Sequence, residues 1–275
     1  MKRQELHARS TREVTMIHGS GRSAIAMRAR SLSTRISHRV GCDWRASTVT
    51  SSAPPPLGFV RFREQMAAAG APLTFRMPDA TLRIRAGCIV EAAKSGRFAD
   101  GGIVTASNAQ MVGNRSVWWG FIGRENVDGA LRAAAGPGLA DECDALPAAT
   151  PGGEKLLPST ARATGPHGLA AAAVLHALAP LSFYIGGGRA SAEAALRKTF
   201  ESCFALADEL ELPSLALPAL GCGVAGIPGA ICARAAFGAL EAAPLARVRT
   251  IEFVLRDDRC YAAFADAAHE RWGRT

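Results

Sequence analysis

Short apolar segments alternate with longer helical segments along most of the chain, and this alternation is the strongest constraint on its fold. Apolar runs ended by turn residues predict strands at residues 73–77, 82–90, 101–108, the second half of 171–180, 214–220 and 249–257. Amphipathic or alanine-rich stretches predict helices at residues 127–146, 190–212, 228–243 and 259–272. Because parallel strands need a crossover connection, usually a helix, we expect a three-layer α/β/α sandwich around a central mixed, mostly parallel sheet.

Three details of this assignment depend on local residues. The alanines of 171–180 also suit a helix, but Pro180 and the turn-rich segment before it favour a strand in the second half. A Gly-Pro pair divides residues 127–146 into two helices. Ser191 is the expected N-cap of the helix over 190–212.

The N-terminal 56 residues carry most of the excess positive charge. Residues 1–56 contain ten lysines and arginines against three acidic residues, whereas residues 57–275 contain 22 against 21. This segment is also rich in serine and threonine, a composition typical of an organelle transit peptide. A solvated tail and an RNA-binding arm are the alternatives. We therefore expect a disordered tail over 1–56 and a folded domain over 57–275. The transit-peptide interpretation implies a mitochondrion or chloroplast, and the alternative location is the cytoplasm or nucleus.

Composition argues against several classes of protein. No run of 18 or more apolar residues is present, so the sequence predicts no membrane span and no membrane partner. The seven cysteines form no C-x-x-C pair, which argues against a structural zinc site and a disulfide framework. No cluster of histidine, aspartate and glutamate suggests a metal. The nearly neutral charge of residues 57–275 argues against direct nucleic-acid binding.

A glycine-rich segment, "LPALGCGVAGIP" at 217–228, joins a predicted strand to a predicted helix. Gly221, Gly223 and Gly226 form a G-x-G-x-x-G pattern. Glycines let backbone N–H groups approach an anion, and the helix that follows adds the positive end of its dipole. The pattern comes late in the chain and lacks the acidic residue that a dinucleotide-binding site needs about 20 residues further on. By itself the motif fits either a phosphate-binding loop or a tight turn.

Five segments together resemble the macrodomain family. In chain order they read "GIVTASNAQ", "NVDGALRAAAGPGLADEC", "GGEKLLPSTARATGPHGL", "AVLHALAP" and "LPALGCGVAGIP", and the resemblance runs from about residue 80 to the C-terminus. It implies a domain that binds ADP-ribose. One branch of the family removes ADP-ribose from proteins or deacetylates O-acetyl-ADP-ribose. The implied partner is ADP-ribose or an ADP-ribosylated protein, with no cofactor, and we expect a monomer.

The resemblance assigns two residues beside the distal ribose. Asn108 matches the asparagine that holds this ribose, a task suited to an amide that both donates and accepts hydrogen bonds. Asp128 matches the aspartate that orients or activates water in the hydrolase branch. Ser107, next to Asn108, is a further expected ligand contact. The alternatives are an Asx turn for Asn108 and a helix N-cap for Asp128.

The remaining expected contacts lie in two loops and at the end of the last strand. The resemblance assigns the diphosphate to Gly221, Cys222, Gly223, Val224, Ala225 and Gly226. The loop near the adenine reads Gly87, Cys88 and Ile89, without the aspartate that the family uses there. Arg256 stands where many members have an aromatic. A guanidinium can stack on a purine, although a solvated arginine is the alternative. Ala225 also replaces an aromatic of the family.

The link between Asn108 and Asp128 is longer than in the family and retains few of its glycines. It contains Trp118, Trp119 and Phe121, which either cap the distal ribose or pack as a small separate cluster. We therefore expect an enzyme that hydrolyses ADP-ribosyl linkages on proteins or O-acetyl-ADP-ribose, and the alternative is a reader module. Retention of the asparagine and aspartate favours a hydrolase, whereas the altered link favours a non-catalytic reader of ADP-ribose.

Three further residues are expected to have no catalytic role. His176 matches a histidine of the family near a strand end, but we expect it in the core. Cys143 and Cys222 have no evident base partner in the sequence, so neither is expected to act as a nucleophile.

Overall fold

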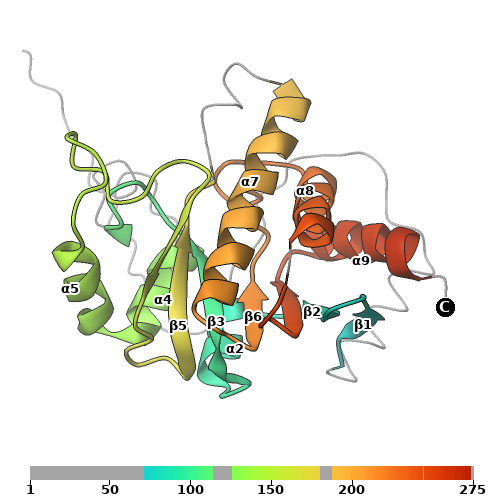
Figure 1. Ribbon diagram of the computed structural model, residues 1–275, viewed down its shortest axis with the longest axis horizontal. Helices are drawn as coiled ribbons and strands as arrows, with labels where there is room; N and C mark the ends of the chain where they lie inside the picture. The colour runs from blue at the N-terminus through green and yellow to red at the C-terminus, as the bar shows by residue number, and fades with distance from the viewer. Residues whose placement is uncertain (1–70, 114–125, 180–187, 244, 274–275) are drawn as a thin grey trace, which may run out of the picture. The chain divides into compact units, whose positions relative to one another are not determined.

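A computed structural model describes residues 71–113, 126–179, 188–243 and 245–273 (Figure 1). The N-terminal tail and the tryptophan-rich part of the link lie outside these residues. The transit peptide, the cellular location and the boundary at residue 56 therefore stay predictions. None of the helices in the described part is long and apolar enough to cross a membrane.

Seven strands form one sheet. In spatial order they are β1 (Leu73–Arg76), β2 (Thr81–Ala86), β7 (Thr250–Leu255), β6 (Ser214–Leu217), β3 (Phe98–Ala106), β5 (Ala171–Ala177) and β4 (Ala161–Thr164). The five strands from β2 to β5 are parallel, and the two edge strands pair antiparallel with their neighbours. The predicted mixed, mostly parallel sheet is confirmed.

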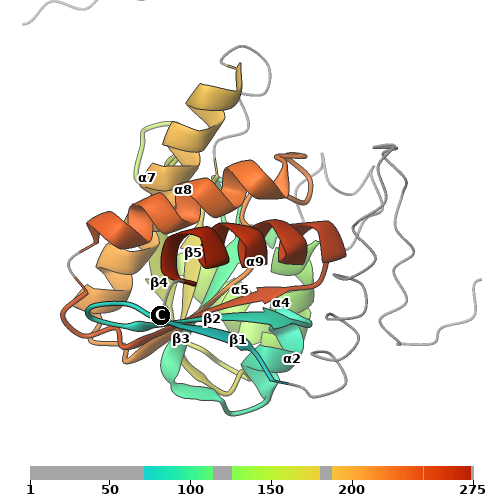
Figure 2. The same ribbon diagram turned by 90° about the vertical axis from the view of Figure 1, so that its right-hand side faces the viewer.

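Helices cover both faces of the sheet (Figures 1 and 2). One face carries α2 (Ile89–Lys94), α4 (Val127–Ala135) and α5 (Pro137–Ala145), and the other carries α7 (Gly188–Glu209), α8 (Gly229–Ala242) and α9 (Asp258–Trp272). Each face buries its own apolar cluster, as a three-layer sandwich requires. The fold class expected from the alternation is therefore correct.

The larger cluster is organised around phenylalanines from α7, α8, α9 and β7. Five of them are fully buried: Phe200, Phe204, Phe237, Phe253 and Phe264. Several meet edge to face, such as the rings of Phe237 and Phe264, whose centroids are 5.5 Å apart. Each buried ring stabilises the fold by about 1.5–3 kcal/mol, which makes this side a rigid support for the loops at the strand ends.

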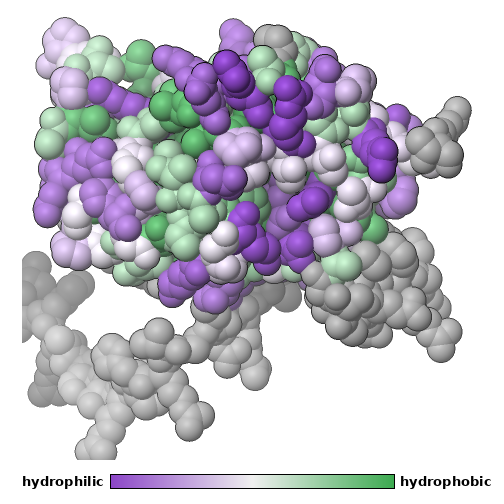
Figure 3. All heavy atoms as spheres, turned by 60° about the horizontal axis from the view of Figure 1, so that its bottom comes forward, coloured by the Kyte–Doolittle hydropathy of each residue, from purple (hydrophilic) through white to green (hydrophobic). Residues whose placement is uncertain are grey.

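Exposed hydrophobic side chains are sparse in the described part of the chain. The large ones are Leu157, Leu210 and Val224. On the face shown in Figure 3, hydrophilic and hydrophobic residues are interspersed rather than gathered into one apolar surface. Val224 is an exception among the hydrophobic residues, because its side chain is exposed in the middle of the glycine-rich loop.

Three local predictions are wrong. The strand predicted over 82–90 ends at Ala86, and Ile89–Lys94 forms α2, because Ile89, Ala92 and Ala93 all bury against the sheet. α7 begins at Gly188, so Ser191 lies in its first turn and is not its N-cap. The short edge strand β4 has no counterpart in the prediction.

Candidate functional site

The loops assigned from the resemblance meet at one edge of the sheet. Cys88 follows β2, Asn108 follows β3, the glycine-rich loop follows β6 and Arg256 follows β7. These four strands are parallel and adjacent in the order β2, β7, β6, β3, so all four loops leave from the same edge. Gly87 N donates to Leu255 O at 2.9 Å and joins the first loop to the last. Ligands of open α/β sheets bind at such edges.

The glycine-rich loop is held by its own backbone. Ile227 N donates to Gly221 O at 3.0 Å, and Gly226 N donates to Gly223 O at 3.1 Å. Gly221 and Gly226 have φ angles of 77° and 65°, which favour glycine. A Cβ on Gly221 would also lie 2.6 Å from the Ile227 side chain. Two of the three motif glycines are thus required by the shape of the loop.

Gly223 is different, because neither its φ angle nor its surroundings demand a glycine. A Cβ there would meet no atom within 4 Å. The backbone N–H groups of Gly223, Val224 and Ala225 have no hydrogen-bond partner within the described ranges. Gly223 and Val224 are exposed, with Val224 at 53%. Three consecutive free N–H donors give this part of the loop a positive partial charge that suits an anion.

The N-terminus of α8 lies two residues beyond this loop. Its N-cap is Pro228, whose carbonyl accepts from Ile231 N and Cys232 N, and no side chain of the described part caps the helix. The first N–H groups and the helix dipole therefore remain available to an anion.

Cys222 turns its thiol inward, toward the cysteines of two helices. Contact with the Cys232 thiol raises the pKa of Cys222, and burial raises it further. Cys232 Sγ donates to Leu220 O at 3.2 Å. Since the thiolate is the nucleophile, the raised pKa argues against reactivity, and only the backbone of Cys222 is available to a ligand.

The loop after β2 can contact a ligand mainly through its backbone groups. Cys88 is the N-cap of α2 and makes no capping side-chain hydrogen bond there. The Ile89 side chain is buried in the core, so its predicted contact with a ligand is limited to its backbone. Arg256 is exposed directly after β7, beside this loop. The structure thus brings Gly87, Cys88 and Arg256 together.

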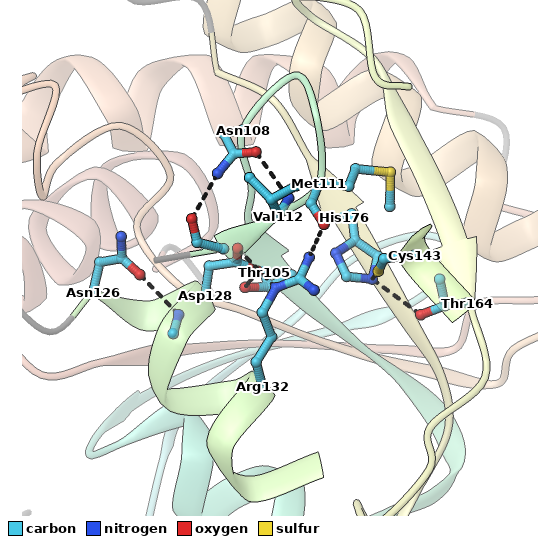
Figure 4. Close-up of polar contacts among 12 residues, drawn as sticks. Thr105, Asn108, Met111, Val112, Asn126, Asp128, Arg132, Cys143, Thr164 and His176 are labelled. Atoms are coloured by element: carbon cyan, nitrogen blue, oxygen red, sulfur yellow. Dashed lines mark hydrogen bonds and ion pairs between the residues drawn. The ribbon is translucent and has the colours of Figure 1, made fainter. Parts of the chain in front are cut away.

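Asn108 organises the segment that follows β3. Its Nδ2 donates to Gly113 O at 3.0 Å, and its Oδ1 accepts from Val112 N at 3.1 Å (Figure 4). Both ends of the amide are engaged with the backbone, but the Oδ1 bond reaches four residues on, so it is not the Asx turn given as the alternative. Ser107 donates its N–H to Ala177 O at 2.8 Å, and its buried Oγ has no partner among the residues described. We refer to residues 109–113 as the roof loop.

Asp128 is buried, with 2% of its surface exposed. It is the second residue of α4, and the N-cap is Asn126, whose Oδ1 accepts from Gly129 N at 2.8 Å. The N-cap interpretation of Asp128 is therefore wrong. Its carboxylate instead accepts from Thr105 Oγ1 at 3.2 Å and from Arg132 Nε at 3.1 Å.

The roof loop covers this ion pair. Arg132 Nη2 donates to Met111 O at 2.9 Å. A Cβ on Gly113 would lie 2.5 Å from Arg132 Cδ and 3.4 Å from Asp128 Oδ2. Burial raises the pKa of Asp128 above its ordinary value, and the charge and hydrogen bond of Arg132 offset part of this rise. The sequence reasoning missed Arg132, although its spacing of four residues from Asp128 is the spacing of an ion pair on a helix.

His176 lies in the core, as expected. Its Nε2 is 3.0 Å from Thr164 Oγ1 and 3.8 Å from Cys143 Sγ, so Cys143 has the base partner that the sequence did not reveal. Burial, followed by the charge of Arg132, lowers the pKa of His176 to about 3, and burial raises the pKa of Cys143. Both groups are neutral at pH 7, so they do not form the ion pair of a cysteine nucleophile.

An open hollow of about 530 Å³ lies against α4, the start of α5 and the roof loop. Its walls are formed by Val112, Gly129, Arg132, Ala133, Gly136, Pro137 and Ala140. These residues are not those assigned to a ligand. In the described part of the chain, no group of three or more histidines, cysteines and acidic residues is arranged to hold a metal ion.

Solved structures share this fold. A macrodomain of Oceanobacillus iheyensis, solved with ADP, aligns with a TM-score of 0.60 and 23% identity over 73% of this chain and 96% of that one. A Trypanosoma brucei macrodomain in complex with ADP-ribose aligns with a TM-score of 0.52 and 23% identity over 68% of both chains. At these identities the likeness concerns the fold.

Sequence relatives carry the same family description. A macro domain-containing protein of Streptomyces nogalater is 33% identical over 53% of this chain and 77% of its own length. An O-acetyl-ADP-ribose deacetylase of Salmonella gallinarum is 35% identical over 49% of this chain and 66% of its own length. A macro domain-containing protein of Xanthomonas axonopodis is 33% identical over 39% of this chain, and the match spans 58% of that relative. The family model described as Macro domain matches residues 104–236, and the chain belongs to this family.

Proposed function

We propose that this chain binds ADP-ribose at the strand edge described above. The diphosphate lies against the glycine-rich loop, the adenine beside Cys88 and Arg256, and the distal ribose beside Asn108. The observation that carries the proposal is the row of free N–H groups at Gly223, Val224 and Ala225, which have no partner in the described part of the chain. A macrodomain of the same fold has been solved with ADP-ribose, which supports this choice of ligand.

The energetics favour a diphosphate over a neutral group in this loop. A hydrogen bond to a charged group stabilises a complex by about 1.5–3 kcal/mol, roughly twice the value for a neutral pair. The positive end of α8 adds to this attraction. Arg256 is exposed beside the first loop, where its guanidinium can stack on the purine.

Hydrolysis at the distal ribose is the second candidate function. Asn108 and Asp128 lie around the same short loop, and a relative 35% identical over part of its length is an O-acetyl-ADP-ribose deacetylase. Against hydrolysis, the Asp128 carboxylate already accepts two hydrogen bonds and is covered by the roof loop. A carboxylate that activates water must reach that water, so turnover requires this loop to move. Binding is therefore the function that the geometry supports best.

Two measurements on the full chain separate the candidates. Calorimetry with ADP-ribose should show saturable binding, and AMP, which lacks the diphosphate, should bind more weakly. Release of ADP-ribose from a mono-ADP-ribosylated protein and of acetate from O-acetyl-ADP-ribose tests hydrolysis. Binding without release supports a reader, and binding with release supports the enzyme. No binding of ADP-ribose would overturn both.

A further inference from the structure

Arg132 is the centre of a buried polar cluster under the roof loop. Its side chain is 10% exposed and reaches two partners from different segments: Asp128 in its own helix and Met111 O in the roof loop. Its Nη1 is also buried and has no partner within the described residues. A guanidinium with these contacts is fixed in one orientation, because its planar fork must satisfy both acceptors.

Both partners of Arg132 belong to the part of the proposed site assigned to the distal ribose. We refer to this part, which consists of Asn108, Asp128 and the roof loop, as the ribose corner. Asn108 holds the roof loop through Val112 N and Gly113 O, and Arg132 holds the same loop through Met111 O. Arg132 therefore connects the two residues, Asn108 and Asp128, that the resemblance assigns to ribose and water.

Arg132 also provides the countercharge of Asp128. Besides Arg132, the carboxylate accepts from the neutral hydroxyl of Thr105. The other titratable groups of the cluster are Cys143 from α5 and His176 from β5, which are neutral at pH 7. Glu142 lies next to Cys143 but is bonded to His167, at 2.6 Å from its Nε2. A buried carboxylate without a partner protonates rather than stay charged, so the charge of Asp128 depends on Arg132.

We infer that Arg132 is a positioning residue that keeps Asp128 ionised and holds it beneath the roof loop. This inference rests on the proposed function for its role in the ribose corner. It implies that any hydrolysis by this chain requires the Arg132–Met111 contact to open, and that the pH dependence of hydrolysis is set by Arg132 as well as Asp128.

The direct test is the ionisation of Asp128 in the full chain without ligand. Carboxyl ¹³C NMR follows the titration, and Asp128→Asn identifies the signal. Arg132→Met should raise the midpoint by about one to three pH units, the usual effect of an opposite charge at this distance. Arg132→Lys keeps the charge and should restore most of the parent midpoint. Arg234→Met removes an exposed arginine paired with Glu193 and should leave the midpoint unchanged.

An unchanged midpoint in Arg132→Met would overturn the inference. If that variant does not unfold cooperatively, Arg132→Gln, which keeps a donor but no charge, should show the same rise, and no rise would overturn the inference equally. Where the parent releases ADP-ribose, the pH at which its rate is half-maximal should move by the same amount. Calorimetry with ADP-ribose tests the proposed function separately, because the titration needs no ligand.

Discussion

The two ends of the proposed ligand site treat their polar groups in opposite ways. In the glycine-rich loop, the N–H groups of Gly223, Val224 and Ala225 have no partner in the described part of the chain, and two hydrogen bonds within the loop hold its backbone. In the ribose corner, Asn108 and Asp128 have their polar atoms bonded to the protein. The first end is ready to receive an anion without rearrangement, whereas the second must exchange existing bonds for new ones.

This difference assigns affinity for the ligand to the glycine-rich loop and turnover to the ribose corner. A preorganised loop contributes binding free energy in full, because no internal bond is lost when the ligand arrives. A closed corner costs free energy to open, and it contributes to catalysis only after opening. We therefore expect substitutions in the loop to change affinity, and substitutions in the corner to change stability and pH dependence.

The largest expected effect is on affinity, from Gly223→Glu. A carboxylate beside the diphosphate adds a clash and a like charge, so ADP-ribose affinity should fall on the order of a thousandfold, since like charges in contact cost several kcal/mol. The fold should tolerate it, because a Cβ at this position meets no atom within 4 Å.

Gly223→Ala is the matched control, and it should bind within a few-fold of the parent. Calorimetry on both variants and thermal melts check these expectations. Unchanged affinity in a folded Gly223→Glu protein would show that the loop does not hold the diphosphate.

The next effect is on stability, from Asp128→Asn. Removing the carboxylate leaves Arg132 buried without its countercharge, so the free energy of unfolding at pH 7 should fall by about 3 kcal/mol. Affinity for ADP-ribose should change little. If the parent is a hydrolase, its turnover should fall on the order of 10²-fold.

Glu193→Gln breaks the exposed pair with Arg234 and serves as the control, with a cost below about 1 kcal/mol. Urea unfolding of both variants gives the comparison. Equal costs for the two variants would contradict the description of the ribose corner as a closed, buried network.

A smaller effect on the free energy of unfolding is expected from His176→Gln, a substitution in β5 next to the ribose corner. Its pKa is about 3 in the folded chain and 6.5 ordinarily. The unfolded chain therefore binds a proton on His176 more tightly than the folded chain does. The stability of the fold that depends on neutral His176 is complete above pH 6.5 and is lost as pH falls toward 3. The loss is about 1.4 kcal/mol per pH unit. His176→Gln should remove this part of the slope, measured as the free energy of unfolding between pH 6.5 and 4.5. Parallel curves for parent and variant would contradict a neutral, buried histidine.

The smallest effect is expected from deleting residues 1–56. They lack hydrophobic periodicity and carry the excess charge, so their removal should change neither the melting temperature nor ADP-ribose affinity measurably. A fluorescent protein fused behind them should enter an organelle of the native host. Diffuse cytosolic fluorescence would remove the transit-peptide interpretation, and a loss of affinity on deletion would mean that the tail takes part in the site.

The parts of the fold that could be predicted are those with a local sequence pattern, either a hydrophobic periodicity or a glycine motif. The alternation of apolar strands and amphipathic helices predicts the order of elements, and the glycines of 221–226 predict the loop. β4 could not be predicted because its sequence, Ala-Arg-Ala-Thr, has little strand preference and is ordered by pairing with β5. α2 is only six residues long, and its helical state depends on burial against the sheet.

The candidate site was predictable in its backbone and less so in its side chains. The strand ends place Asn108 and the loop at one edge, as expected from the alternation. The state of Asp128 depends on Arg132, on Thr105 and on the roof loop, which meet only in the folded chain. Similarly, Cys143 and His176 are 33 residues apart in the sequence, and no local pattern indicates their contact.

The most direct test of the account is an ADP-ribose titration of the ¹⁵N-labelled full chain, followed by amide NMR. We predict that the amide signals of Gly223, Val224 and Ala225 move downfield to saturation as their free N–H groups bond to the diphosphate. The signals of Gly165 and Val248, which are bonded to Glu142 and Asp208 at the opposite edge of the sheet, should move less. Saturable binding that leaves the three loop amides unmoved would contradict the central claim.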